Sequence, residues 1–369
     1  MRVFLVSTPP LGHLFPMIPL AWALRSAGHD VLVATTGPAL AAATVAGLPA
    51  VDIAPGLDMG LVFTRVIEEH PHLMSTQLGE GLRDFREVAM LFAALSGHMT
   101  DELVRTAETW RTDLVVYGVF ATAGAIAADR LGVPAVQHDI AFTSTAGVHE
   151  SIVAHLDTQP SHAAVISTAP PSVVAPAEGT WPMRYLPYNG GGVLPDWLLA
   201  PAERPRVAVT LGTVSPTMFG LGPVPCLMHI AEEINAEFIL ALGDTALDGL
   251  ERLPSNVRST GWLPLSALLP RCAAVIHHGG SGTVYNALVA GVPQLLVPDG
   301  ADRALNAAAV CACGAGLSAR TKEIDTNLVR RLLNDQALKD ATAEIRAEIG
   351  GMPTPSTLIH RLTGLVVGT

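Results

Sequence analysis

Residues 273–288 constrain the fold of this chain more than any other stretch. They read Ala-Ala-Val-Ile-His-His-Gly-Gly-Ser-Gly-Thr-Val-Tyr-Asn-Ala-Leu, with an apolar run before the glycines and a helical pattern after them. This order predicts a buried strand, a glycine turn and the start of a helix. The first turn of such a helix presents backbone N–H groups and the positive end of the helix dipole, and glycines let an anion approach closely. We therefore expect a phosphate group to bind here.

The glycines do not follow the G-x-G-x-x-G fingerprint, and no Lys-Ser/Thr pair follows them as in a P-loop. NAD and ATP are therefore not the first ligands to consider. His277 ends the predicted strand, and open parallel sheets collect their ligands at the carboxyl ends of their strands. An isolated histidine is more often a core residue, but the adjacent phosphate turn favours a ligand-binding role for His277.

The heptapeptide at 277–283 resembles the His-x-Gly-Gly-x-Gly-Thr signature of the family 1 nucleotide-sugar glycosyltransferases. The chain is most similar to the bacterial enzymes that glycosylate enediynes and aromatic polyketides. The resemblance extends from Gly-His-Leu-Phe-Pro at 12–16 to Gly-Met-Pro-Thr-Pro at 351–355. It implies the α/β fold called GT-B, in which two Rossmann-like domains with doubly wound parallel sheets face a central cleft. It also implies a hexosyltransferase whose co-substrate is a nucleotide sugar and which needs no cofactor.

Composition narrows the class of protein and of partner. With 369 residues, of which 49% are hydrophobic and 15% charged, the chain can bury two cores. A formal net charge of −11 disfavours nucleic acid as a partner. The apolar stretches are interrupted before they reach the ~20 residues that a membrane-spanning helix needs, and the first residues lack the apolar core of a signal peptide. The four cysteines fit reduced thiols. We expect a cytoplasmic protein without a membrane partner, and the sequence leaves a homodimer open.

Alternating strand and helix patterns organise the first half of the chain. We expect strands at 2–6, 29–34, 50–53, 114–117 and 133–137, separated by helices at 17–27, 38–46 and 121–131. Such alternation predicts a parallel, doubly wound sheet. Residues 61–110 read either as a solvated helical pair or as a wall of an acceptor pocket.

A stretch rich in Pro, Gly and Ala at 158–206 reads as an interdomain linker, within which 181–188 could add a strand to the first domain. A second series of strands is expected at 206–211, 237–242, 257–260, 274–277, 294–297 and 316–318. The resemblance then implies an acceptor-binding domain at 1–198 and a donor-binding domain at 199–352. A C-terminal helix within 353–369 would cross back to the first domain.

The second domain supplies the expected donor site. Gly212 and Thr213 would join the glycine turn in surrounding a diphosphate with N–H and O–H donors, which stabilise a leaving group. The chain has no Asp-x-Asp pair, so we expect no metal site and metal-independent transfer. The full expected donor set is Gly212, Thr213, Trp262, Leu263, His277, Gly279, Gly280, Ser281, Gly282, Thr283, Asp302 and Arg303.

Three members of this set have specific expected roles. Trp262 either stacks on a pyrimidine base, as the resemblance implies, or is a core residue. Asp302 matches the Asp of the family's Asp-Gln pair, which holds sugar hydroxyls. Arg303 replaces the Gln, and because Arg only donates hydrogen bonds, this favours a deoxysugar donor with fewer hydroxyls. A solvent-facing Arg303 at a helix start is the alternative.

His13 is the candidate catalytic base. An imidazole with an ordinary pKa of roughly 6.5 can accept a proton near neutrality, and His13 matches the catalytic His of the family's Gly-His-x-x-Pro segment. A loop histidine that caps the next helix is the alternative. Many relatives place an acidic residue after the 114–117 strand, where this chain has Gly118-Val119-Phe120. Either another group orients His13, or the acceptor hydroxyl is acidic, as in a phenol, or the base function is lost.

Five phenylalanines suit either a flat aromatic acceptor or a core: Phe15, Phe63, Phe92, Phe120 and Phe142. We predict an inverting transferase that moves a deoxyhexose from a dTDP-sugar to a hydroxyl of a polyketide or enediyne-type aglycone in antibiotic biosynthesis. The alternatives are a UDP-sugar-dependent transferase, a GT-B nucleotide-sugar epimerase, a cell-wall sugar transferase, and a non-catalytic protein that binds nucleotide sugars.

Overall fold

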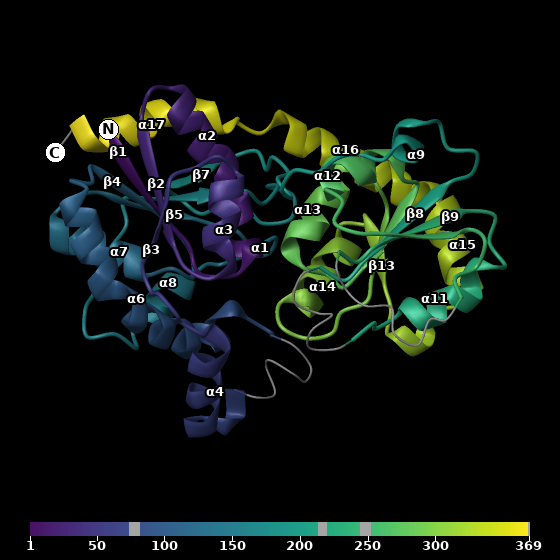
Figure 1. Ribbon diagram of the computed structural model, residues 1–369, viewed down its shortest axis with the longest axis horizontal. Helices are drawn as coiled ribbons and strands as arrows, with labels where there is room; N and C mark the ends of the chain where they lie inside the picture. Colours follow the sequence, from purple (N-terminus) through teal and green to yellow (C-terminus); the bar gives the residue numbers. More distant parts are fainter. Residues whose placement is uncertain (74–81, 213–219, 244–251, 368–369) are drawn as a thin grey trace. The chain divides into compact units, whose positions relative to one another are not determined.

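The computed structural model describes residues 1–73, 82–212, 220–243 and 252–367. Its internal contacts divide the chain into two compact units (Figure 1). Unit 1 comprises Met1–Gly79, Arg83–Tyr188 and Gly351–Thr369, and unit 2 comprises Glu80–Leu82 and Asn189–Gly350. Each unit is built around one parallel β-sheet.

The sheet of unit 1 has the strand order β3-β2-β1-β4-β5-β6-β7, and every neighbouring pair is parallel. Its strands are β1 (Arg2–Val6), β2 (Asp30–Thr35), β3 (Ala50–Asp52), β4 (Leu114–Gly118), β5 (Ala135–His138), β6 (Ala164–Ser167) and β7 (Thr180–Pro182). Its α-helices are α1 (Leu11–Leu14), α2 (Ile18–Ser26), α3 (Pro38–Val45), α4 (Met59–Glu69), α6 (Ala89–Thr109), α7 (Ala123–Leu131), α8 (Val148–Val153) and α17 (Ile359–Val367). Short 3-10 helices are η1 (Phe15–Met17), η2 (Pro71–Leu73), η3 (Phe85–Val88) and η6 (Pro355–Leu358).

The sheet of unit 2 has the order β10-β9-β8-β11-β12-β13 and is also parallel throughout. Its strands are β8 (Arg206–Thr210), β9 (Glu237–Ala241), β10 (Val257–Thr260), β11 (Ala274–His277), β12 (Gln294–Leu296) and β13 (Gly316–Ser318). Its helices are α9 (Asp196–Leu199), α11 (Val224–Ala231), α12 (Leu265–Leu268), η4 (Leu269–Arg271), α13 (Ser281–Ala290), α14 (Arg303–Ala312), η5 (Thr321–Glu323), α15 (Thr326–Asn334) and α16 (Gln336–Gly351).

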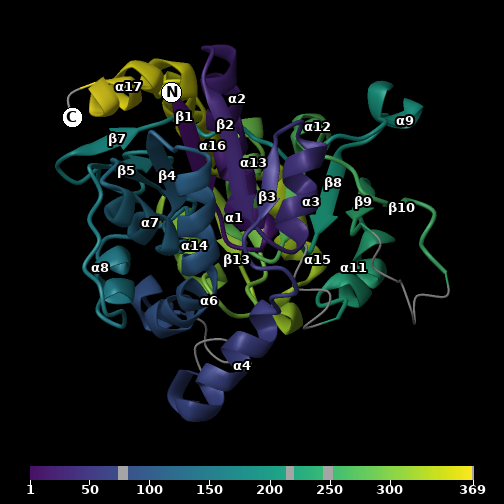
Figure 2. The same cartoon turned by 60° about the vertical axis from the view of Figure 1, so that its left-hand side comes forward.

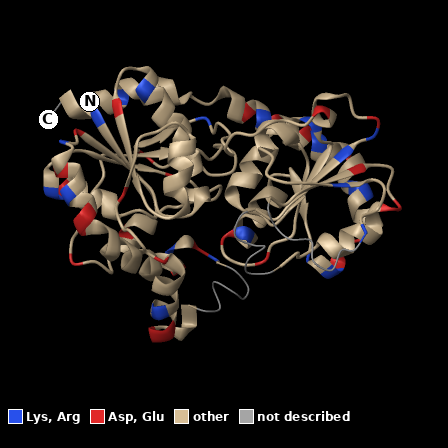
Figure 3. Ribbon diagram, viewed as in Figure 1, with Lys and Arg blue, Asp and Glu red and all other residues tan. Residues whose placement is uncertain are grey.

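Both sheets confirm the predicted Rossmann-like, doubly wound class. In each, the first strand lies in the middle and the chain later returns to its other side, so the order reverses between β1 and β4 and between β8 and β11. Parallel strands covered on both faces are apolar throughout, and β4 and β8 are buried at every position. In Figure 3 the charged residues accordingly lie mainly on helices, loops and strand ends. The reversal leaves a place for ligands beyond the carboxyl ends of the strands.

Two sequence-based interpretations need correction in unit 1. The interpretation of residues 61–110 as solvated helices is correct for α4, which is mostly exposed and extends away from the sheet (Figures 1 and 2). It is wrong for α6, whose Leu91, Leu95 and Leu103 are fully buried and which packs along α7. The linker interpretation of 158–206 is wrong for β6, because the short apolar run at 163–166 pairs with β5 despite its Pro-rich surroundings. The strand considered at 181–188 is present in part as β7, which pairs with β6.

The C-terminal segment packs within unit 1. Leu362 of α17 is fully buried, and the guanidinium of Arg361 lies 5.6 Å from the ring centroid of Trp181 in β7. The backbone N–H of Arg184 donates to the carbonyl of Pro353 at 2.7 Å. Residues 351–367 thus add both apolar burial and a hydrogen bond to the unit formed by the first half of the chain. Within the described ranges, no helix is long and apolar enough to cross a membrane.

Replacing Leu362 by Ala should destabilise unit 1. The substitution empties part of a fully buried site and should lower the free energy of unfolding by about 2–5 kcal/mol. Urea unfolding followed by tryptophan fluorescence measures the change. Val367→Ala, on the same helix but 86% exposed, is the matched control and should leave stability unchanged. Equal stability of both variants would show that α17 does not contribute to the core.

Candidate active site

The glycine turn joins β11 to α13 as predicted. Gly280 is the N-cap residue of α13, and the helix begins at Ser281. Gly279 has a φ of 96°, and a Cβ atom there would lie 3.1 Å from the carbonyl oxygen of Arg303. A larger residue would be strained by its backbone conformation and crowded by the start of α14. The residue at position 279, just before the first turn of α13, must therefore be glycine.

His277 is fully buried at the end of β11, and both of its ring nitrogens have partners in unit 2. The backbone N–H of Gly279 donates to Nδ1 at 3.1 Å, so the proton of the neutral ring is on Nε2. That N–H donates to Oε1 of Gln294 at 2.9 Å. Burial lowers the pKa of His277 to about 4, which keeps the ring neutral at neutral pH. In this arrangement His277 shapes the turn.

His278 lies between the end of β8 and the glycine turn. A Cβ atom on Gly212 would lie 2.6 Å from Cε1 of the imidazole, and one on Gly280 would lie 2.5 Å from Nε2. Both glycines are therefore needed to make room for the ring. Burial, Arg303 and His277 lower the pKa of His278 well below its ordinary value. Sequence reasoning did not single out His278, although the doubled histidine was visible; Thr213, expected beside it, lies outside the described residues.

A polar network ties the turn to α14. The side-chain amide of Asn306 donates to the carbonyl of Gly279 at 2.9 Å, to Oγ of Ser281 at 3.0 Å and to Oδ2 of Asp302 at 2.8 Å. Oγ of Ser281 also donates to Oδ2 of Asp302, at 3.1 Å. Asp302, expected to hold sugar hydroxyls, thus also orders the turn. Asn306 was missed; its one signal was its position one helical turn after Asp302.

Arg303 does not face solvent at the start of α14. Its side chain is buried and forms an ion pair with Asp299, four residues earlier. The solvent-facing interpretation is therefore wrong, because the pair with Asp299 draws the guanidinium inward. Among the described residues, no group of three or more His, Cys, Asp or Glu side chains is arranged to hold a metal ion.

Trp262 and Leu263 follow β10 and differ in exposure. The indole of Trp262 is 47% exposed, and its N–H donates to the carbonyl of Asn189 at 3.1 Å. Gly190 lies close to the same ring edge. The core interpretation is therefore wrong for Trp262, whose ring is anchored through its N–H and remains about half exposed. Leu263 is buried in the core of unit 2, so its backbone is what it can offer a ligand.

His13 lies in α1, just beyond the carboxyl end of β1 and beside the point where the strand order reverses. Nδ1 lies 2.5 Å from Oγ1 of Thr8, within hydrogen-bond distance. The imidazole stacks on Phe120, with ring centroids 5.2 Å apart and an interplanar angle of 29°. Burial lowers the pKa of His13 from 6.5 to about 4, so the ring is neutral at neutral pH. Thr8 was not anticipated from the sequence, where no motif marked it.

Aromatic rings surround His13 on this side of unit 1. Phe92 of α6 stacks on Phe120 at 4.5 Å, Phe63 of α4 meets Phe92 edge-on at 5.4 Å, and Phe85 lies 5.6 Å from Phe120. The structure thus brings three of the five predicted acceptor residues together and adds Phe85. Phe15 instead meets Tyr188 edge-on, and Phe142 is fully buried. The cluster has one polar member, the imidazole.

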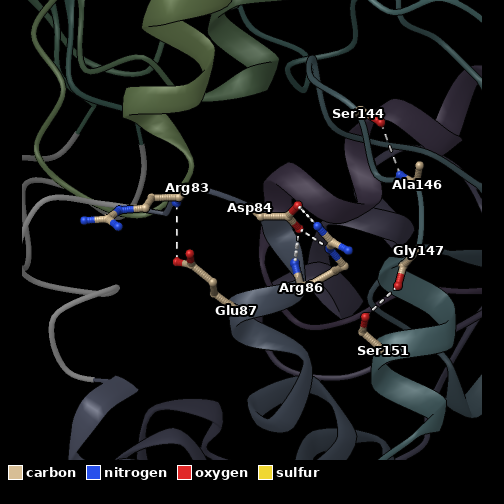
Figure 4. Close-up of polar contacts among 8 residues, drawn as sticks. All are labelled: Arg83, Asp84, Arg86, Glu87, Ser144, Ala146, Gly147 and Ser151. Carbon is tan, nitrogen blue, oxygen red and sulfur yellow. Dashed lines mark hydrogen bonds and ion pairs between the residues drawn. The ribbon is translucent and has the colours of Figure 1, made fainter.

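The segment that holds Phe85 is fixed by capping interactions, drawn in Figure 4. The carboxylate of Asp84 accepts from the backbone N–H of Arg86 at 2.7 Å and forms an ion pair with its guanidinium, which starts η3. The backbone N–H of Arg83 donates to Glu87 at 3.3 Å. On the neighbouring segment, Oγ of Ser151 donates to the carbonyl of Gly147 at 2.7 Å. These local bonds place Phe85 at the entry to α6.

Two family models match the chain. The N-terminal domain of the erythromycin biosynthesis protein CIII-like family matches residues 22–212, and its C-terminal domain matches residues 226–365. Together they cover most of both units and include the glycine turn, Asn306 and the Phe cluster.

Individual relatives are similar over nearly their whole length. The elloramycin glycosyltransferase ElmGT of Streptomyces olivaceus is 40% identical, over 98% of this chain and 97% of its own. The aclacinomycin-T 2-deoxy-L-fucose transferase of Streptomyces galilaeus is 30% identical, over 99% and 96%. The crystal structure of the glycosyltransferase SsfS6 from Streptomyces sp. SF2575, complexed with thymidine diphosphate, superposes with a TM-score of 0.83 at 29% identity, covering 99% of each chain.

Two Rossmann-like sheets, a glycine turn at a helix start and these similarities define a glycosyltransferase of the GT-B fold. The chain belongs to the family 1 glycosyltransferases of bacterial natural-product biosynthesis, as its sequence motifs predicted.

The imidazole of His13 should stay neutral down to about pH 5. Burial depresses its pKa, so protonation is unfavourable in the folded state and sets in only as the pH falls toward 4. NMR of protein labelled in its histidine rings measures the titration, and the His13→Gln spectrum assigns the signal. A His13 signal that titrates with an apparent pKa above 6 would contradict the buried environment described here.

Proposed function

We propose that this enzyme transfers a deoxyhexose from a dTDP-sugar to a hydroxyl of an aromatic polyketide-type aglycone, with inversion at the anomeric carbon. The observation on which this rests most is the setting of His13: a neutral imidazole, held through Nδ1 and surrounded by aromatic rings, beyond the first strand of unit 1. Such a group can accept a proton from a flat acceptor packed against the rings.

The donor would bind at the carboxyl edge of the other sheet. The glycine turn at 279–283 offers backbone N–H groups and the N-terminus of α13 to the diphosphate, with His277, Gln294 and Asn306 holding the turn. Trp262 offers an exposed indole for the base. The complex of SsfS6 with thymidine diphosphate supports a dTDP donor, and the similarity to the aclacinomycin-T 2-deoxy-L-fucose transferase supports a deoxysugar.

The remaining donor contacts are proposed by position. Gly212, Gly279, Gly280, Ser281, Gly282 and Thr283 would surround the phosphates, Leu263 would reach the base through its backbone, and Asp302 would accept from a sugar hydroxyl. Because Arg303 pairs with Asp299, its contribution to the sugar site would be to hold the start of α14. We assign donor binding to residues 199–352 and acceptor binding to residues 1–198 with 353–369. The two compact units support such a division, with their own boundaries after Tyr188 and after Gly350.

One in-line displacement accounts for the reaction. The acceptor oxygen forms a bond to the anomeric carbon while the bond from that carbon to the diphosphate oxygen breaks, and dTDP leaves with the electron pair. The acceptor proton passes to Nε2 of His13. N–H donors aimed at the leaving diphosphate stabilise its developing charge without requiring a metal. A single displacement inverts the anomeric configuration.

dTDP should stabilise the protein more than UDP does. A ligand at 100 times its dissociation constant adds about 2.7 kcal/mol to the state that it binds, a shift of several degrees in melting temperature. Differential scanning fluorimetry with each nucleotide, in the presence of EDTA, measures the shift. A larger shift with UDP would favour a UDP-sugar donor, and a shift that appears only with added magnesium would contradict metal independence.

Replacing Asn306 by Asp should weaken dTDP binding about tenfold. The variant loses the donors to Gly279 and Ser281 and sets a second carboxylate beside Asp302, next to an anionic ligand. Calorimetric titration with dTDP gives the dissociation constant. Asn334→Asp, an exposed change on α15 of the same unit, controls for the added charge. If both variants bound dTDP like the wild type, the glycine turn would not depend on Asn306.

Replacing His13 by Ala should reduce turnover by ~10²–10⁴ and leave dTDP affinity unchanged, because the proton acceptor is lost while the donor site is intact. Transfer from a dTDP-deoxysugar to a hydroxylated anthraquinone, followed by chromatography, measures turnover. His98→Ala, an exposed change on α6, is the control. Undiminished turnover of His13→Ala would reject its role as the base. NMR of the glycoside gives the anomeric configuration, and retention would exclude a single displacement.

A further inference from the structure

The position at which many relatives were expected to place a carboxylate is filled by an aromatic ring in this chain. After β4 the chain continues as Val119 and Phe120, and the ring of Phe120 stacks on the imidazole of His13. Phe92 approaches the same imidazole, with ring centroids 6.0 Å apart. Apolar rings thus pack against His13 and restrict its tilt, but they cannot choose which nitrogen holds the proton.

Thr8 supplies the polar contact. Its Oγ1 lies 2.5 Å from Nδ1 of His13, and its side chain is buried two residues beyond the end of β1. Two side-chain hydrogen bonds hold the main chain at Thr8. The carbonyl of Thr8 accepts from Oγ of Ser7 at 3.1 Å and from Oγ1 of Thr35, at the end of β2, at 3.4 Å. The hydroxyl therefore stands at a fixed position relative to the imidazole.

We propose that Thr8 is the positioning residue of His13. The hydroxyl oxygen of Thr8 accepts a hydrogen bond from Nδ1–H of His13, and this leaves the lone pair of Nε2 for the proton of a phenolic acceptor. A hydroxyl oxygen has lone pairs for this bond, and it keeps the bond when Nε2 takes the proton and the ring becomes an imidazolium. The inference rests on the proposed function, in which His13 is the base.

The presence of Thr8 in place of a carboxylate affects how acidic the acceptor hydroxyl must be. A neutral hydroxyl orients the ring but stabilises an imidazolium less than a carboxylate does, because hydrogen bonds between ionised partners are stronger. Burial holds the pKa of His13 near 4. A base this weak removes a proton from a phenol far more readily than from an aliphatic alcohol. Thr8 and the rings together therefore suit a phenolic hydroxyl.

Three variants test the assignment. Thr8→Val is similar in shape but lacks the oxygen, and it should lower turnover with a phenolic acceptor by about 10- to 100-fold through loss of ring orientation. The KM for the dTDP-sugar and the affinity for dTDP should not change. Thr8→Ser restores the oxygen and should retain most of the turnover. Thr44→Val, an exposed change on α3, is the matched control and should behave like the wild type.

Thr8→Asp tests the role of Thr8 through the pH dependence of kcat, which would not change if Thr8 only stabilised the fold. A carboxylate beside Nδ1 raises the pKa of the imidazole, and the base must be unprotonated to act. The fall of kcat at low pH should therefore begin at a higher pH in Thr8→Asp than in the wild type. The ratio of turnover with a benzylic alcohol to turnover with a phenol should rise in the same variant.

Nitrogen-15 NMR of the wild-type protein examines the tautomer directly, without any variant having to fold. The chemical shifts should show the proton on Nδ1 of His13 and the lone pair on Nε2. A proton on Nε2, or wild-type turnover in Thr8→Val, would overturn the role of Thr8. Wild-type turnover in His13→Ala would instead overturn the proposed base itself, so the two failures are distinguishable.

Discussion

The reversal of strand order at the centre of each sheet is the constraint on which both candidate sites depend. Successive strands to one side of β1 and β8 are connected in one direction, and those to the other side in the opposite direction. The loops after β1 and β4, and after β8 and β11, therefore diverge at the carboxyl edge. Backbone groups and side chains in these loops are free to face a ligand, because the sheet hydrogen bonds end there.

In unit 2 this edge is occupied by a glycine turn that the rest of the domain holds rigid. Gln294 holds His277 from β12, Asn306 holds the carbonyl of Gly279 from α14, and His278 fills the space between the turn and β8. The turn needs glycine because its neighbours approach closely, and the close approach is what fixes its N–H groups. Donors fixed before the ligand arrives need no reorganisation when charge develops on a leaving group.

In unit 1 the same edge is occupied by aromatic rings around one polar side chain. Helix α6 brings Phe92 and α4 brings Phe63 to the loop that carries Phe120, and His13 lies against these rings. Apolar surroundings keep the imidazole neutral, and Thr8 is its hydrogen-bond partner. The two edges thus differ in chemistry: one presents backbone N–H groups at a helix N-terminus, and the other presents aromatic rings around a neutral imidazole. Relatives across nearly the whole length of the chain are glycosyltransferases.

The sequence alone determined the fold class, most strand positions, the glycine turn and the family, because these depend on local signals. Runs of β-branched residues, the spacing of helices, and glycines at fixed positions are visible without knowing what lies next to them. Tertiary structure decided which elements form by pairing or packing with distant parts of the chain. The short apolar run of β6 became a strand only by pairing with β5, and α6 became a core helix only by packing on α7.

The site followed the same division. His13, His277 and the glycines could be chosen from the sequence, since their chemistry is local. Their partners could not, because Asn306 lies 27 residues from Gly279 in the chain, and Thr8 reaches His13 only through the turn that starts α1. Packing also decided that Phe85 joins the rings near His13 while Phe15 does not. Sequence specified which groups can do chemistry, and tertiary contacts set their orientation, protonation and exposure, because these depend on distances that only the folded chain defines.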